Sequence, residues 1–579
     1  MTRRCTALIA LGAFVLGSPL SVVGEEPATA PVPVESSDDD PRVPTDVDLG
    51  TDVITPSRTA TALFELPYSA DVVESRLQER QYRTVPEALR DVPGVSVQKT
   101  GHGQGSPFIR GFTGYQTLFL IDGIRLNNSV FRSGPNQYWA TIDPFSLQRL
   151  EVIKGPASVQ YGSDAVGGAV NALTRSPRLS GEDRSFHGRL FGRAASAENS
   201  AIGRAEVDAT VRRGKLGVLG GVTGKVFGDL EGGDHVGTQE NTAYDEYAGD
   251  VKAEYRMEDG HRLVFLYQKL RINDAPRTHR TQESIMWHSL TQGSDIQRDF
   301  DQERDLAYVQ LHSAELEDVV DRFSVSVSWQ RQQETENRVR SNGAISADGF
   351  DVNTYGVWAQ AESDSSIGQF LYGVEWYHDE VDSFSSSNAI QGPVGDDATY
   401  DLLGVFIQDT IPVGDRVDVI LGGRLTWAFV DIGSLEDFGT GNAVDFDDDY
   451  FAATGSARAQ LFLDEERRFS IFGGASQAFR APNLSDLTRL DDFGTSGFEI
   501  PSTDLDPEQF TQLEIGVKSD HRWIRGQAAY FYTFIDDLIL RVPQGPNPSD
   551  PTQTIFAKQN SGSGYIHGVE LGASVPEQR

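Results

Sequence analysis

The sequence has almost no cysteine, since Cys5 is the only one among 579 residues. It lies within residues 1–24, which have the features of a secretory signal: Arg3 and Arg4 at the start, an apolar core over Ala7–Leu16, and a small-residue cleavage site ending at Gly24. We expect this signal to be cleaved. The mature chain would then have no cysteine, which excludes disulfides and thiolate-bound metals.

The chain also lacks an apolar run long enough to cross a membrane as a helix. The apolar core of the signal is too short to span a bilayer. No later segment resembles a transmembrane helix. An exported chain of this kind is either soluble outside the inner membrane or an outer-membrane barrel.

Positive charge is scarce. The sequence has 50 Lys and Arg residues against 85 Asp and Glu residues, which gives a net charge of −35. A surface of this sign repels phosphate backbones, so no nucleic-acid partner is expected.

What the chain has instead, from Ser185 onward, is a regular alternation of apolar and polar residues. The clearest run is Phe323–Gln330, where the two kinds alternate strictly. This period of two is typical of strands with one apolar face. About sixteen such runs can be counted, each longer than the usual strand of about five or six residues.

The connections between these runs alternate between short and long. The short ones include Arg213-Gly214, Glu258–Gly260, Val413–Asp415, Asp464–Glu466 and Asp520-His521. The long ones include Gly228–Thr242, Asn273–Gln302, Thr335–Gly349, Asp382–Thr399, Asp431–Val444 and Arg480–Pro507. An outer-membrane barrel has this rhythm, because its periplasmic turns are short and its external loops are long. We therefore predict an all-β transmembrane barrel.

Ahead of these runs, Tyr68–Leu173 is predicted to be a small α/β unit. Apolar runs at Thr117–Ile121 and Leu150–Ile153 indicate strands, and Asp143-Pro144 is typical of a helix start. The unit is too small to share the core of a wide barrel. It is therefore predicted to fill the barrel lumen as a plug.

Two segments precede the α/β unit. Residues 25–50 are rich in Pro, Ala, Val and Asp and offer little apolar surface, so a disordered periplasmic tether is expected. Thr51–Arg58 is a short β-prone stretch with two interpretations. It is either the first strand of the next domain or a peptide that adds as a strand to the sheet edge of a partner.

Eight short motifs stand out along the chain. In the α/β unit they are Ile109-Arg110-Gly111, Leu120–Gly123, Leu150–Pro156 and Tyr161–Asn171. In the strand-rich part they are Phe479–Pro482, Leu505–Glu508, Leu513–Gly516 and Gly568–Gly572. Together they resemble the motifs of TonB-dependent outer-membrane receptors, and the resemblance runs from about Thr51 to Val575.

The resemblance implies active uptake of a scarce nutrient across the outer membrane, here a ferric siderophore or another iron complex. A haem or cobalamin receptor of the same family is an alternative, as is a non-transporting outer-membrane protein that binds or adheres through its long loops. No catalytic residue, cofactor or metal site is expected, so the chain is predicted not to be an enzyme. The implied partners are TonB with its inner-membrane energising complex, outer-membrane lipids and the iron-complex ligand. A monomer is expected.

In the light of this resemblance, residues 51–58 are interpreted as the TonB box. The predicted coupling residues are Asp52, Val53, Ile54, Thr55, Pro56 and Ser57. The plug is assigned to residues 59–178 and the barrel to residues 185–579. Residues 25–50 are too few for the signalling domain that some receptors carry, so transport without transcriptional signalling is expected.

Four charged residues match a contact between plug and barrel. Arg110 and Lys154 match plug positions that face two barrel glutamates in the family, and Glu514 and Glu570 match those glutamates. Alternation around both acids places them on the lumen face. Because buried charges must be paired, we predict that these four residues lock the plug in place.

Ligand contacts are predicted in the plug loops and one external loop. The candidates are His102, Gln104, Tyr115, Arg132, Gln137, Tyr138, Trp139, His279 and His288. Aromatic rings beside an arginine suit an aromatic, anionic ligand such as a catecholate complex. Haem is disfavoured, because no histidine occurs between Arg480 and Pro507, where haem receptors of the family carry one.

The strand count differs from that of the family. The resemblance implies a barrel of 22 strands, whereas about sixteen are predicted here and the chain stops at Pro576–Arg579, where a periplasmic turn is due. An open barrel would expose unpaired strand edges to lipid at a high cost. We therefore expect a truncated reading frame, a fragment, or a missing portion that is supplied separately.

Overall fold

The fold is described from a computed structural model. It describes residues 52–53, 61–74, 77, 80–101, 103–179, 184–232, 237–257, 260–278, 281–284, 292–314, 319–493 and 497–575. The chain divides into two compact units, Met1–Val43 and Pro44–Arg579. Every described residue belongs to the second unit.

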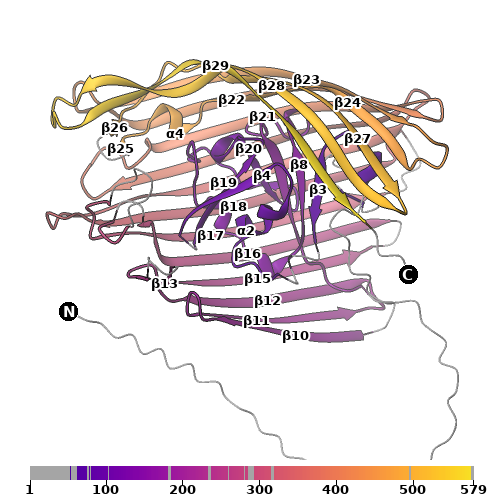
Figure 1. Cartoon of the computed structure of the whole chain (residues 1–579), viewed down its shortest axis with the longest axis horizontal. Coiled ribbons are helices and arrows are strands. Elements are labelled where there is room, and N and C mark those ends of the chain that lie inside the picture. The colour runs from indigo at the N-terminus through magenta and orange to yellow at the C-terminus, as the bar shows by residue number, and fades with distance from the viewer. Residues whose placement is uncertain are drawn as a thin grey trace, which may run out of the picture. The chain divides into compact units, whose positions relative to one another are not determined.

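Most of the described residues form one sheet of eighteen strands, which Figure 1 shows from β10 to β29 and in which all pairs of long strands are antiparallel. Its long strands are β10 (Arg184–Ala195), β11 (Ser200–Val211), β12 (Leu216–Phe227), β15 (Tyr244–Arg256), β16 (His261–Pro276), β17 (Gln297–Ser313), β18 (Arg322–Val339), β19 (Ile345–Asp364), β20 (Gln369–Ser385), β21 (Asp396–Val413), β22 (Val417–Asp437), β23 (Asn442–Phe462), β24 (Phe469–Arg480), β27 (Glu508–His521), β28 (Ile524–Pro546) and β29 (Thr554–Ser574). The short members, β25 (Asp491–Phe493) and β26 (Gly497–Glu499), lie in the connection between β24 and β27. In the described part of the chain, the sixteen long strands confirm the predicted number of runs.

The alternation of the sequence separates two faces of this sheet. Val374, Val405 and Leu425 are direct cross-strand neighbours on β20, β21 and β22, and each is more than 40% exposed. Residues between them point the other way, and Glu375 and Arg424 are buried there in an ion pair of 2.5 Å. An apolar outer face and a polar inner face are what a barrel needs in lipid.

The two ends of the sheet differ from its interior. Within the described residues, β10 pairs with β11 alone, and β29 pairs with β28 and, over three residues, with β26. None of the described helices is both long enough and apolar enough to cross a membrane.

Two of the predicted long connections are shorter than expected. β18 continues to Val339 and β19 begins at Ile345, while β22 continues to Asp437 and β23 begins at Asn442. The prediction of loops over Thr335–Gly349 and Asp431–Val444 is therefore wrong in extent. Polar composition suggested loops, but antiparallel pairing satisfies the backbone N–H and C=O groups just as well beyond the bilayer.

The α/β unit forms as predicted from Tyr68 to Leu173. Its strands are β3 (Ala70–Val73), β4 (Val95–Gly101), β5 (Gln104–Ile109), β6 (Leu118–Ile121), β7 (Ile124–Arg125), β8 (Leu147–Lys154) and β9 (Gly168–Thr174). Its helices are η1 (Leu63–Glu65), α2 (Val85–Ala88), η2 (Leu89–Asp91), η3 (Gly114–Gln116), η4 (Tyr138–Ala140), η5 (Pro144–Ser146) and α3 (Ser158–Tyr161). A mixed sheet in the order β3-β8-β9-β6-β7 forms its centre. Asp143 caps η5 by accepting a hydrogen bond from the Phe145 backbone N–H at 3.3 Å.

This unit packs against the inner face of the large sheet, where Figure 1 shows its elements in indigo and violet. Buried plug residues such as Phe119 and Val170 belong to the same apolar cluster as Leu306, Val352 and Val430 of the sheet. The small unit therefore fills the lumen as a plug. The remaining short elements are β1 (Asp52–Val53), β2 (Thr61–Ala62), β13 (Leu230–Glu231), β14 (Thr238–Gln239) and α4 (Leu484–Leu487).

We predict that a charge on the outer face is tolerated only near the strand ends. Val405→Arg should lower the free energy of unfolding by about 2–4 kcal/mol, because it places a cation against acyl chains. Thr399→Arg lies on the same face of β21, six residues nearer the external end, and should cost about 1 kcal/mol or less. Urea unfolding in lipid vesicles measures both, and equal losses would contradict a lipid-facing surface at Val405.

Candidate functional site

The plug and the large sheet meet at a cluster of buried charges around Arg110. Its Nη2 donates to Glu514 Oε1 on β27 at 2.6 Å and to Glu570 Oε2 on β29 at 2.8 Å, and its Nε donates to Glu570 Oε1 at 3.0 Å. All three side chains are nearly inaccessible to solvent. Hydrogen bonds between ionised groups of this kind are the strong ones.

Lys154, at the end of β8, lies in the same cluster. Its Nζ is 3.4 Å from Glu570 and 2.8 Å from Asp71 on β3, and it donates to the Pro93 carbonyl at 3.1 Å. The structure thus brings together the four charged residues selected from the sequence. Residues more than 400 positions apart in the chain are in direct contact here.

Three further members of the cluster were missed by sequence reasoning. Arg458 on β23 donates to Glu514, Ser69 Oγ donates to Glu514 Oε1 at 2.8 Å, and Asp71 pairs with Lys154. The alternation of residues along the strand indicates that Arg458 faces the lumen. Which acid Arg458 contacts there depends on how the whole sheet closes, and the sequence around Arg458 does not show this.

The backbone of the plug comes unusually close to these charges. Gly94 and Gly155 both have positive φ values, of 80° and 93°. A Cβ at Gly94 would overlap the Glu570 carboxylate, and one at Gly155 would overlap the Gln512 amide. Glycine is therefore required at both places.

The acids keep Arg110 charged. Burial disfavours the cationic guanidinium, but Glu514 and Glu570 outweigh it and raise the pKa of Arg110 above its ordinary value. For Asp71 burial dominates, so its pKa is raised although Lys154 favours the ionised carboxylate.

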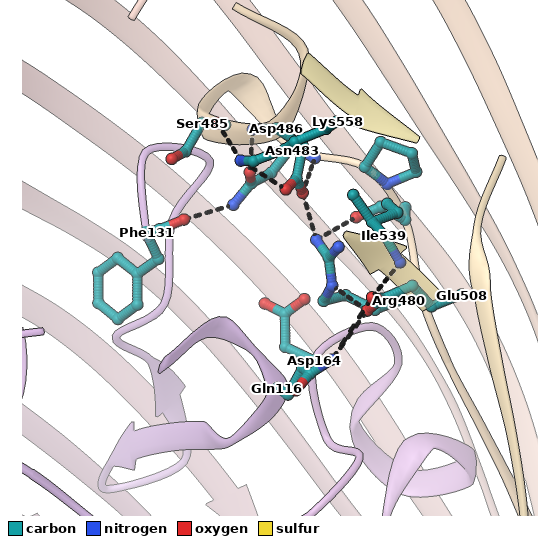
Figure 2. A network of polar contacts seen from close by, with 12 residues as sticks. Gln116, Phe131, Asp164, Arg480, Asn483, Ser485, Asp486, Glu508, Ile539 and Lys558 are labelled. Carbon is teal, nitrogen blue, oxygen red and sulfur yellow. Dashed lines mark hydrogen bonds and ion pairs between the residues drawn. The ribbon is translucent and has the colours of Figure 1, made fainter. Parts of the chain in front are cut away.

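A second polar network joins the connection after β24 to the plug (Figure 2). Arg480 Nε donates to Glu508 Oε2 at 2.6 Å, and its Nη1 donates to Asp486 Oδ2 at 2.5 Å. Lys558 Nζ on β29 donates to Asp486 Oδ1 at 3.0 Å. These four side chains are fully buried, and α4 is held by a capping box between Asn483 and Asp486.

The same network reaches the plug at its loops. Asn483 Nδ2 donates to the Phe131 carbonyl at 2.9 Å, and Gln116 Nε2 donates to Glu508 Oε2 at 3.2 Å. The Arg480 guanidinium lies 3.6 Å from the centre of the Tyr115 ring. The motifs Phe479–Pro482 and Leu505–Glu508, quoted above only for their resemblance, supply Arg480 and Glu508 to this network.

Three of the predicted ligand contacts lie in the interior. Tyr115 is covered by Arg480, and Tyr138 and Trp139 are completely buried, Trp139 packing edge-on against Phe119 at 4.2 Å. These rings are part of the plug core, which differs from the expected position at its surface. A loop sequence does not distinguish an aromatic ring that packs inward from one that faces a ligand.

Two other predicted contacts lie beside a pocket at the end with the long connections. Arg132 lines this pocket of about 160 Å³, together with residues of β18, β19, the β20–β21 connection and residues 489–492. Its Nη2 donates to Gln137 Oε1 at 2.5 Å, and Gln137 Nε2 donates to Glu334. Gln104 is buried in β5. The remaining candidates, His102, His279 and His288, lie outside the described residues.

The predicted TonB box is described only at its start. Asp52 and Val53 form β1, which pairs antiparallel with Thr61–Ala62 of β2. Ile54, Thr55, Pro56 and Ser57 lie outside the described residues. In the part of the chain that is described, no group of three His, Cys, Asp or Glu side chains is placed to hold a metal ion.

A sheet with an apolar outer face, whose lumen holds a plug fixed by buried ion pairs, defines a plugged outer-membrane β-barrel. The chain belongs to the TonB-dependent receptors. Residues 212–576 match the family described as "TonB dependent receptor-like, beta-barrel", and residues 62–169 match the "TonB-dependent Receptor Plug Domain". The resemblance identified from the motifs is confirmed. This family consists of outer-membrane transporters and receptors and is not an enzyme class.

Relatives with different names are similar to this chain. It is 38% identical over 132 residues to a vitamin B12 transporter BtuB of Vibrio vulnificus, which covers 22% of this chain and 21% of that protein. It is 25% identical over 549 residues to an iron-regulated outer membrane virulence protein of Vibrio cholerae serotype O1. That match covers 90% of this chain and 75% of the relative. The fold is the same as in a solved structure of the Serratia marcescens hemophore receptor HasR in complex with its hemophore HasA and heme. The TM-score is 0.73 at 18% sequence identity, and the match covers 88% of this chain and 80% of that one.

We predict that neutralising one lock carboxylate loosens the plug. Glu514→Gln leaves Arg110 and Arg458 buried with less negative charge, and unpairing a buried charge costs about 3–5 kcal/mol. Ser158→Cys, a buried plug position, introduced into a Cys5→Ser chain reports plug release as maleimide labelling in urea. Labelling should occur at lower urea in Glu514→Gln.

Glu380→Gln, which removes an exposed carboxylate on β20, is the matched control and should leave labelling unchanged. Adding Arg110→Met to Glu514→Gln should restore part of the loss, because it removes one uncompensated cation. If Glu514→Gln labels at the same urea concentration as the parent, the ion pairs do not hold the plug.

We also predict that Arg480 holds the connection between β24 and β27. Arg480→Met leaves Asp486 and Glu508 with fewer partners in a buried site, so local opening should become about tenfold more frequent or greater. Trypsin cleavage after Arg489, followed by mass spectrometry, measures this rate. Arg416→Met, an exposed arginine in the turn between β21 and β22, should leave it unchanged, and equal rates in both variants would refute a holding role for Arg480.

Proposed function

We propose that this chain carries out TonB-dependent active uptake of a scarce nutrient across the outer membrane. The observation that carries the proposal is the buried charge cluster of Arg110, Lys154, Glu514 and Glu570 in a member of this family. Apolar packing alone is enough to hold a plug permanently in place. Ion pairs separate when water enters the lumen and solvates the charges, and they form again when the water leaves. The four residues then act as a lock that is broken and remade in each cycle.

The proposed organisation follows from the sequence. Residues 1–24 direct export and are cleaved, residues 25–50 tether the coupling segment in the periplasm, and residues 51–58 bind TonB. The plug then comprises residues 59–178 and the barrel residues 185–579. The receptor acts as a monomer, with TonB, its inner-membrane energising complex and outer-membrane lipids as partners.

Coupling to TonB requires a strand that is easily released. Among the described residues, β1 and β2 form a separate two-stranded sheet, and an isolated pair of strands is weak. TonB can therefore compete for Asp52 and Val53 by adding them to its own sheet edge. Tension on this segment passes into the plug close to β3, where Asp71 contacts Lys154 of the lock.

The proposed ligand is an iron complex, and specifically a ferric siderophore. Support comes from the name of the Vibrio cholerae relative. Arg132 lines the external pocket together with other basic and with acidic side chains, and is the cation we assign to the ligand. Gln137 positions Arg132 by accepting its hydrogen bond. His102, His279 and His288 remain candidate contacts, whereas Tyr115, Tyr138 and Trp139 are buried in the plug core.

We predict that deleting Val53–Ser57 abolishes uptake and leaves ligand binding to cells intact. A deletion of equal length within residues 25–50 is the control and should transport normally, because the proposed tether only has to span a distance. Growth and uptake are measured under iron limitation with siderophores, haem and cobalamin offered separately. Uptake that survives the box deletion contradicts TonB coupling and favours a binding or adhesion protein.

A further inference from the structure

The plug does not fill the lumen evenly. A cavity of about 740 Å³ lies between it and strands β15–β19. Met257, Gly260, Ala314 and Arg322 line the cavity, which places it at the end of the sheet with the short turns, the periplasmic end. Its volume falls within the range of about 300–1,000 Å³ that small-molecule sites occupy.

The sheet bonds the plug backbone directly elsewhere in the lumen. Lys518 Nζ donates to the Leu63 carbonyl at 2.7 Å and the Leu66 carbonyl at 2.6 Å, and Gln460 Nε2 donates to the Phe64 carbonyl at 2.7 Å. On β17, Arg304 Nε donates to the Thr141 carbonyl at 2.8 Å. The cavity therefore lies in a lumen where the plug is otherwise bonded to the sheet.

The cavity is bounded on the plug side by Asp122, in the turn after β6. The Asp122 carboxylate accepts hydrogen bonds from Tyr308 at 2.6 Å and Thr174 at 2.5 Å, and Lys252 Nζ lies 3.4 Å away. Gln310 Nε2 donates to the Asp122 carbonyl at 3.0 Å. Because these contacts use the acceptors of Asp122, it presents little free acceptor capacity to the cavity.

The lining offers apolar as well as polar surface. Trp358 is 9% exposed and lines the cavity, while its indole N–H is itself inaccessible. Val264 and Leu173 supply further apolar surface nearby.

Cations outnumber acids in the lining. The basic residues are Arg149, Lys252, Arg256, Arg262 and Arg322, with His261 and His312 beside them. Two further acids line the cavity besides Asp122. Glu254 lies 3.8 Å from Arg262, and Glu362 lies 3.1 Å from Arg322. A ligand that fits this lining has acceptor oxygens with negative charge and an apolar or aromatic body.

We propose that this cavity is a binding site for an amphipathic organic anion on the periplasmic side of the plug. The body of the anion packs against Trp358 and Val264, and its charged oxygens accept hydrogen bonds from Lys252 and Arg262. In transport such a site would hold a ligand that has already passed the plug. That role rests on the proposed function, whereas binding itself does not.

The first test measures the local potential with Ser324→Cys, a cavity-lining position on β18, in a Cys5→Ser chain. Reaction rates with an anionic and a cationic methanethiosulfonate reagent are compared in the purified full chain. Asp415→Cys, in the exposed turn between β21 and β22, is the control. The ratio of anionic to cationic rates should be about tenfold higher at Ser324→Cys.

The second test uses 8-anilinonaphthalene-1-sulfonate, an aromatic sulfonate, as the probe. It should slow modification of Ser324→Cys in a saturable way and leave Asp415→Cys unaffected. Trp358→Ala removes apolar surface from the lining, and Arg262→Gln removes one cation. Each should weaken protection by about fivefold to tenfold.

An equal rate ratio at the two cysteine positions would overturn the proposal, as would protection that does not saturate or that occurs equally at both positions. Protection that is unchanged in both Trp358→Ala and Arg262→Gln would also overturn it. These rates do not depend on TonB, so they are unaffected by deletion of Val53–Ser57. Failure of uptake and failure of this site are therefore distinguishable.

Discussion

Buried charge in the lumen is the constraint on which the rest of this structure depends. The inner face of the large sheet is polar, so the plug that fills it must either leave charges unpaired or supply opposite charges at matching positions. Glu514 and Glu570 are buried acids, and Arg110 and Lys154 are the plug cations that meet them. The position of the plug in the lumen depends on this pairing as well as on apolar contact, because an unpaired buried charge costs several kcal/mol.

The outer face imposes a separate constraint. Lipid supplies no hydrogen bonds, so every backbone group in the bilayer must be paired within the sheet. Alternation along each strand keeps charged side chains away from the lipid, since Val374 and Val405 face outward while Glu375 and Arg424 pair inside. The same pairing continues past the bilayer in β22 and β23, which is why strands extend through regions whose polar composition is typical of loops.

The attachments of the plug are unequal around its circumference. On one side the lock and the network of Arg480, Asp486 and Glu508 join it to β23, β24, β27 and β29. On the β15–β19 side a large cavity lies below Asp122. Above this cavity the same strands also bond the plug, since Tyr308 and Gln310 of β17 donate to Asp122. In the proposed transport cycle, a ligand would leave along β15–β19.

The sequence by itself determined the class of protein. Export features, strands of alternating residues, the rhythm of short and long connections and the motifs around Arg110 and Glu514 are all local patterns, and local patterns can be read without a fold. Only the tertiary structure decided that Arg458 and Asp71 join the lock, that Tyr138 and Trp139 turn inward, and that a cavity remains beside Trp358. The physical reason is distance along the chain: a period of two shows which face a side chain is on, but which of many lumen-facing groups it meets depends on how hundreds of residues close around the plug.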